Sequence, residues 1–133
     1  MASVESVIFN RLTADADIRE AVKGNILPEW GDSLSPAIVY EMSIDSVNDT
    51  YEGKRDTDYE VTISVVANTL ARVLEIADLV IANLHRAQWS DEPYRVLESD
   101  YRDRDVDSID VGEAQNKRLA VVDLKFDFKI TQG

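Results

Sequence analysis

The C-terminal run from Arg118 to Gln132 alternates apolar and polar side chains almost without interruption. Its apolar positions are Ala120, Val122, Leu124, Phe126, Phe128 and Ile130, and its charged positions are Asp123, Lys125, Asp127 and Lys129. Successive side chains of a β-strand point to opposite faces, so this pattern predicts a long strand that is buried on one side only. A charged row of mixed sign discourages uncontrolled edge pairing yet can match a charged partner. We therefore expect this strand to contribute to an assembly surface.

Length and composition limit the chain to one domain, residues 1–133. At 133 residues, with 44% apolar and 30% charged residues, it can bury one hydrophobic core and not two. No apolar stretch approaches the roughly 20 residues that a membrane helix needs, and the N-terminus has no signal-peptide pattern. We expect a chain made in the cytoplasm with no membrane partner. The absence of cysteine excludes disulfides and cysteine-ligated zinc.

The formal net charge of −12 argues against binding to nucleic acid. Lys and Arg side chains that neutralise phosphates supply most non-specific affinity for DNA, and this chain has a large excess of acid. Half of that excess lies in one stretch, Asp91 to Glu113, where nine carboxylates face three arginines, 3 − 9 = −6. Free DNA is not an expected ligand.

The order of helical and strand patterns predicts the fold class. Apolar spacing of three and four predicts helices at about 4–12, 16–23 and 70–86, with Ser3, Asp15 or Ala16, and Asn68 or Thr69 at their starts. Alternation predicts strands at 37–44, 58–67, 94–105 and 118–132. The segment 25–36 reads as a loop and 89–93 as a turn. We expect an α+β domain with an antiparallel or mixed four-stranded sheet and helices packed on one face.

The polar segment 45–57 is predicted to be a mobile loop that becomes ordered only on assembly. It is too long for a tight hairpin and too polar to pack into its own core. Its candidate contact residues are Tyr51, Lys54 and Arg55, because a tyrosine supplies rigid contact area and an arginine can reach an acidic neighbour.

No catalytic, cofactor or metal site is predicted. His85 is the only histidine and lies at a helix end, so a small hydrolase remains only as a distant alternative. The run Asp103-Arg-Asp105-Val-Asp107-Ser108 begins like a calcium loop, but it lacks the required glycine at the sixth position and a glutamate at the twelfth. Two tryptophans, Trp30 and Trp89, read equally well as interface residues or as caps on the core.

Several local patterns resemble the tail terminator, or tail completion, proteins of long-tailed phages, a family that includes minor tail protein U of lambdoid phages. The first half carries Leu12-Thr-Ala-Asp, Val22-Lys-Gly24, Asn-Ile-Leu-Pro28 and Ser35-Pro36-Ala-Ile-Val-Tyr40. The second half carries Tyr59-Glu-Val-Thr-Ile-Ser-Val, a long helix, Asp100-Tyr-Arg-Asp-Arg-Asp105 and a final strand ending in aromatics and Ile130. The acid-rich 91–113 region departs from a lambda-type member, so contractile-tailed or divergent phages remain open as sources.

The resemblance implies a structural virion protein and not an enzyme. It implies a homohexameric ring at the head-tail junction that caps the major tail tube protein, stops tube polymerisation and offers a surface to the head-tail connector protein. DNA would only pass through, and an acidic wall would let the duplex slide. The family has no active site, so only the 45–57 segment and the acidic strand are carried over as interface candidates. On that strand the candidates are Arg102, Asp103, Arg104, Asp105 and Asp107. The alternatives are an acidic decoy that mimics DNA, or another protein-binding module, and a face that is merely solvated.

Overall fold

The computed structural model describes residues 4–28, 36–49, 55–111 and 117–132, which form three helices and a six-stranded sheet. In chain order the elements are α1 (Ser6–Ala14), α2 (Ala16–Ala21), β1 (Ile26–Leu27), β2 (Ala37–Asp49), β3 (Arg55–Ala67), α3 (Leu70–Leu84), β4 (Trp89–Asp91), β5 (Tyr94–Val111) and β6 (Lys117–Gln132). None of the helices in this described part of the chain is long and apolar enough to span a membrane.

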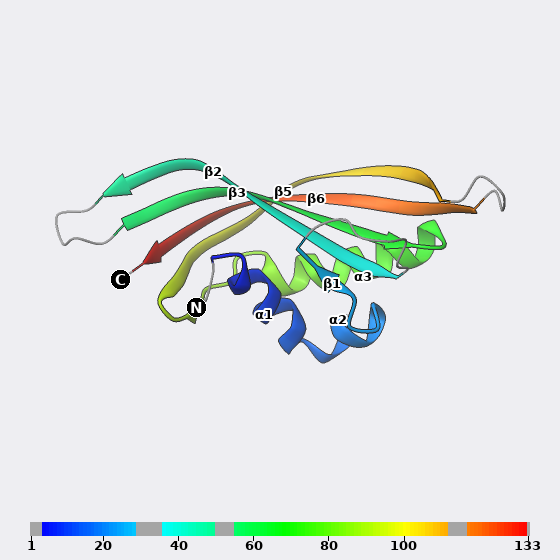
Figure 1. Ribbon diagram of the computed structural model, residues 1–133, viewed down its shortest axis with the longest axis horizontal. Helices are drawn as coiled ribbons and strands as arrows, with labels where there is room; N and C mark the ends of the chain where they lie inside the picture. Colours follow the sequence, from blue (N-terminus) through cyan, green and yellow to red (C-terminus); the bar gives the residue numbers. More distant parts are fainter. Residues whose placement is uncertain (1–3, 29–35, 50–54, 112–116, 133) are drawn as a thin grey trace.

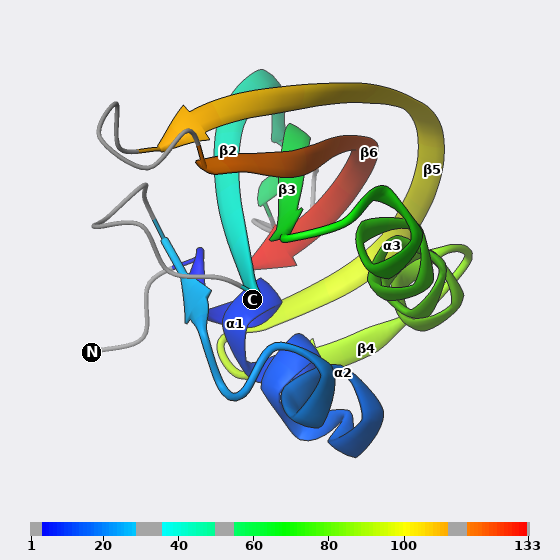
Figure 2. The ribbon, with the colours of Figure 1, turned by 90° about the vertical axis from the view of Figure 1, so that its right-hand side faces the viewer.

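The expectation of a four-stranded sheet is wrong. The strand order is β1-β2-β3-β6-β5-β4, with β1 parallel to β2 and every other pair antiparallel, and the sheet curls into a half-barrel (Figure 2). The two additional strands, β1 and β4, are two and three residues long and lie in the segments predicted to be a loop and a turn. Strands this short show no periodicity, so only their pairing with a longer neighbour identifies them.

Strand β6 lies in the interior of the sheet, between β3 and β5. Its predicted apolar row is confirmed, because Val122, Leu124, Phe126, Phe128 and Ile130 are all buried. Both edges of β6 are paired, so its charged row does not protect an edge of the sheet. This differs from the expectation drawn from the sequence. The row instead lies beside side chains of the two neighbouring strands.

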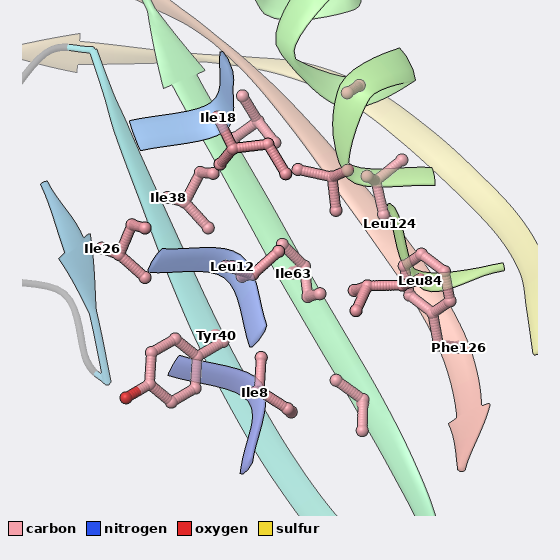
Figure 3. Close-up of a cluster of buried hydrophobic side chains, with 14 of the residues drawn as sticks. Ile8, Leu12, Ile18, Ile26, Ile38, Tyr40, Ile63, Leu84, Leu124 and Phe126 are labelled. Atoms are coloured by element: carbon pink, nitrogen blue, oxygen red, sulfur yellow. The ribbon is translucent and has the colours of Figure 1, made fainter. Parts of the chain in front are cut away.

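All three helices lie on one side of the sheet (Figure 1). Between them and the strands, side chains such as Leu12, Ile38, Ile63 and Leu124 point toward one another and are fully buried (Figure 3). Thr69 caps α3 by accepting a hydrogen bond from the backbone N–H of Arg72 at 3.2 Å. The helix side of the sheet therefore holds the main core, and a smaller buried apolar cluster of Val66, Leu119 and Val121 lies on the other face.

Part of the segment 45–57, which the sequence predicts to be a loop, is strand: residues 45–49 and 55–57 belong to the sheet, and 50–54 lie outside the described residues. Strand β2 continues to Asp49 and β3 begins at Arg55, and the two pair up to Asp49 opposite Arg55. Strand β5 likewise runs to Val111 instead of ending near Asp105. The sequence hid these extensions because their residues show no regular alternation of apolar and polar side chains.

Candidate assembly surface

The face of the sheet that carries no helix presents charged side chains in rows across β3, β6 and β5. Pairing places four rows side by side: Asp58, Lys129 and Glu98; Glu60, Asp127 and Asp100; Thr62, Lys125 and Asp103; and Ser64, Asp123 and Asp105. Directly paired residues share a face, with Cβ atoms roughly 5 Å apart. Together with Arg102 these rows, which we call the acidic face, hold eight carboxylates and three cations, a formal charge of 3 − 8 = −5.

Part of this charge is compensated within the face. Arg102 lies where the β5–β6 register shifts, and its guanidinium contacts both carboxylate oxygens of Asp127 at 3.2 Å. The hydroxyl of Ser64 donates a hydrogen bond to Oδ1 of Asp123 at 2.5 Å. The acids of β6 are therefore held by neighbours, whereas Asp103 and Asp105 on β5 are exposed. The excess negative charge of the face is concentrated toward β5.

A shallow groove of about 340 Å³ runs across one end of the acidic face. Its lining residues are Asp58, Tyr59, Glu98, Asp100, Asp127, Phe128 and Lys129. The side chain of Tyr59 itself packs against the core on the opposite face, where burial raises the pKa of its phenol and a hydrogen bond to Thr57 acts in the opposite direction. Among the described residues, no group of three or more acidic or histidine side chains is arranged to hold a metal ion. The groove thus offers charge and shape but no coordination site.

The structure separates the predicted interface residues. Tyr51 and Lys54 lie outside the described residues, and Arg55 and Asp107 lie in β3 and β5 at positions whose side chains are not described. Asp103 and Asp105 lie together on the acidic face. Arg104 pairs with the buried Leu124 and so belongs to the helix-side face, whereas the register shift between Tyr101 and Asp103 places Arg102 on the acidic face, which the sequence pattern could not show.

The two remaining sequence candidates have structural positions. His85 ends α3, and its Nδ1 accepts a hydrogen bond from the backbone N–H of Tyr101 at 3.1 Å. Trp89 packs edge-on against Phe128 with ring centroids 5.7 Å apart, and the guanidinium of Arg11 lies 4.9 Å from its ring centroid. The core-cap reading of Trp89 is therefore the one that its contacts support. Trp30 lies outside the described residues.

One edge of the sheet is covered only over the first part of β5. Strand β4 pairs with Tyr94 to Val96. The segment that follows α3 contacts the next part of β5. There the N–H of Arg86 donates to the carbonyl of Ser99 at 2.7 Å, and His85 contacts Tyr101. Among the described residues none pairs with this side of β5 beyond Tyr101. We call residues 103–111 the β5 edge.

The opposite edge is open in the same way. Strand β1 pairs only with Ile38 and Val39, and no described residue pairs with the outer side of β2 beyond them. We call residues 40–49 the β2 edge. Each open edge carries an exposed large apolar side chain, Ile44 at 64% and Val106 at 53% exposure. Sequence reasoning missed both, because neither breaks the local pattern and only strand order shows that they lie on edges.

No protein-family model matches this chain, and no curated protein matches it. Among solved structures, a chain from the virion of a native gene transfer agent particle has a similar fold, with a TM-score of 0.74 and 16% sequence identity. The likeness covers 98% of this chain and 96% of that chain. At this level of identity the comparison shows that the two chains share one fold over nearly their whole lengths.

Proposed function

We propose that this chain is a structural subunit of a phage-like virion. The observation that carries the proposal is the fold shared, over almost all of both chains, with a chain of a gene transfer agent virion. The proposed role is assembly with other virion proteins and involves no catalysis.

Within that role, we propose that the chain forms a hexameric ring that caps the tail tube. The ring stops the major tail tube protein from adding further subunits and presents its other side to the head-tail connector protein. The order of elements that resembles tail terminators supports this assignment, and so does the acidic face. A carboxylate-rich sheet turned toward the central channel would repel DNA phosphates and let the genome slide through.

Deleting the gene in a host that produces the particles tests this function. We expect tails of uncontrolled length and no particles in which head and tail are joined, because tube subunits polymerise until a cap blocks the addition of the next subunit. Electron micrographs of the lysate provide the measurement, and restoring the gene in trans is the control. Tails of normal, uniform length in the deletion strain would contradict the capping function.

The charge pattern of the acidic face favours this role over that of a DNA-mimicking decoy. A decoy needs dense carboxylates without opposing cations, whereas Arg102 is paired with Asp127 and Lys125 and Lys129 interrupt the rows. Recovery of a DNA-binding enzyme in stoichiometric amounts on the purified chain would reverse this preference.

A further inference from the structure

We propose that neighbouring copies of this chain join through their open strand edges, with the β2 edge of one copy pairing with the β5 edge of the next. This inference deepens the proposed ring and rests on it. The occupant of each edge is thus a second copy of the same chain, and the junction is a continuation of the sheet.

Strand direction permits this pairing. Strands β2, β3, β6 and β5 are antiparallel in succession, so β2 and β5 run in opposite directions within one copy. A rotation about a ring axis preserves direction, and it therefore brings β5 of one copy beside β2 of the next as another antiparallel pair. The two surfaces differ, so the contact is head-to-tail, which is the kind that closes into rings.

The two exposed apolar side chains define the register of the junction. Ile44 pairs with Tyr59 and Val106 pairs with the buried Val122, so both belong to the helix-side face of the sheet. Directly opposed residues share a face, so Ile44 of one copy can lie opposite Val106 of the next and cover it. In this register Tyr40 lies opposite residue 110, next to the point where β1 stops pairing.

The offset between the edges suits a closed barrel. Within one copy, strand pairing aligns Val106 with Val122, Val122 with Val65, and Val65 with Ile38. Placing Ile44 of the next copy opposite Val106 therefore shifts that copy along the strands by 44 − 38 = 6 residues. Six residues span roughly 20 Å along a strand, and the four long strands of one copy span roughly 19 Å across. The strands would then tilt by about 45° from the ring axis, at the upper end of the tilt usual for barrels. The free ends of β2 and β5 indeed lie at opposite ends of the molecule (Figure 1).

Charge disfavours the alternative in which two β5 edges pair with each other. That arrangement would place Asp103 and Asp105 of both copies in one row, and like charges on adjacent strands destabilise a sheet. In the register that opposes Ile44 to Val106, pairing with β2 places Asp103 opposite Val47, and Asp105 opposes one carboxylate, that of Asp45, where the β2–β3 register is irregular. Pairing with β2 thus opposes fewer carboxylates than pairing of two β5 edges would.

Cysteine cross-linking of the full-length chain tests the junction, because the natural chain has no cysteine. The double variant Ile44→Cys, Val106→Cys should give, under mild oxidation, a reducible ladder of covalent oligomers that ends at the ring size. Paired antiparallel strands hold opposed Cα atoms roughly 5 Å apart, which suits a disulfide. Within one copy the two positions are three strand spacings apart across the sheet, roughly 14 Å, and are also offset by roughly 20 Å along the strands, so they cannot bond to each other.

The matched control is Ile44→Cys with Leu70→Cys, because Leu70 is similarly exposed, at 50%, but lies on α3. We expect at least about tenfold more covalent oligomer from the edge pair than from this control, since strand pairing holds the sulfurs at bonding distance. Each single variant should stop at dimers.

Native mass spectrometry of the reduced variants distinguishes a failure of the edge junction from a failure of ring formation. Rings of normal size without a ladder above the control would overturn the edge junction and leave the capping ring standing. A chain that stays monomeric at its highest soluble concentration and gives no ladder would also overturn the junction. The tail-length micrographs then decide the capping function independently.

Discussion

At the residue scale, Asp15 shows how one side chain connects two helices. Its Oδ1 accepts hydrogen bonds from the backbone N–H groups of Asp17 and Ile18, at 2.9 and 3.1 Å, and so caps α2. Its Oδ2 accepts from the amide of Asn83 on α3 at 3.1 Å. Burial opposes ionisation, but these hydrogen bonds, together with the charge of Arg11, hold the pKa of the carboxyl below its ordinary value of 3.8.

We predict that Asp15→Ala lowers the free energy of unfolding by about 1–2 kcal/mol at neutral pH, the usual cost of losing an N-cap. A depressed folded-state pKa stabilises the fold above the unfolded value of 3.8, and this contribution is lost as the pH falls through the folded pKa. The difference between wild type and variant should therefore shrink at acidic pH. Urea denaturation at about pH 7 and about pH 3 measures it, with Asp15→Asn as the uncharged cap. An equal difference at both pH values would contradict this account.

At the element scale, the sheet is covered by helices on one face, and its two edges are only partly paired. The N–H of Ile38 donates to the carbonyl of Asn25 at 2.8 Å, which shows that this N–H points away from β3. Register is regular from Ile38 to Ile44, so alternation aims the N–H of Ile44 at the same outer side. The β2 edge therefore has hydrogen-bonding capacity that pairing with β3 does not use.

We predict that Ile44→Pro abolishes oligomers while leaving the monomer folded. Proline removes an outward N–H and no bond of the β2–β3 ladder, and edge positions tolerate it. Ile44→Thr is the matched control, because it also removes apolar surface but keeps the N–H, and it should weaken assembly without abolishing it. Analytical ultracentrifugation and thermal melts give the two readouts. If the proline variant assembled as well as the threonine variant, the β2 edge would not be a junction.

At the scale of the whole molecule, the helices cover one face of the sheet, and the other carries the acidic face beside a small buried apolar cluster of Val66, Leu119 and Val121. This division makes the molecule strongly polarised, with the apolar core beneath the helices and a formal charge of −5 on the acidic face. Solvated charges contribute little to stability, so the acidic face can be altered without unfolding the chain.

We predict that replacing Asp103, Asp105 and Asp107 with Asn leaves the fold intact but reduces the yield of infectious or DNA-filled particles. The physical reason is that a less acidic channel would bind phosphates and slow the passage of DNA. The matched control neutralises three exposed acids on the helix side, through Asp17→Asn, Glu20→Gln and Asp78→Asn. Particle titre after complementation is the measurement. Equal titres for both triple variants would show that the acidic face is only a solvated surface.

The sequence by itself determined the elements that the core requires. Strand β6, most of β3 and helix α3 follow from periodicity, because burial of one face imposes a repeat of two on a strand and of about 3.6 on a helix. Asp15 and Gly24 were also recognisable as helix boundaries, and Gly24 does adopt a positive φ of 77°. These features depend on neighbours in sequence.

Only the tertiary structure decided the strand count, the place of β6 and the edges. Strands β1 and β4 exist because longer strands pair with them, and β6 is interior because β3 and β5 flank it. Ile44 and Val106 became candidates once strand order placed each on an open edge, and a shift in register at Arg102 brought Arg102 to Asp127 on the acidic face while Arg104 lies on the helix side. The physical reason is that hydrogen bonding between strands joins residues far apart in the chain, and the pattern of one segment does not record which partner it meets.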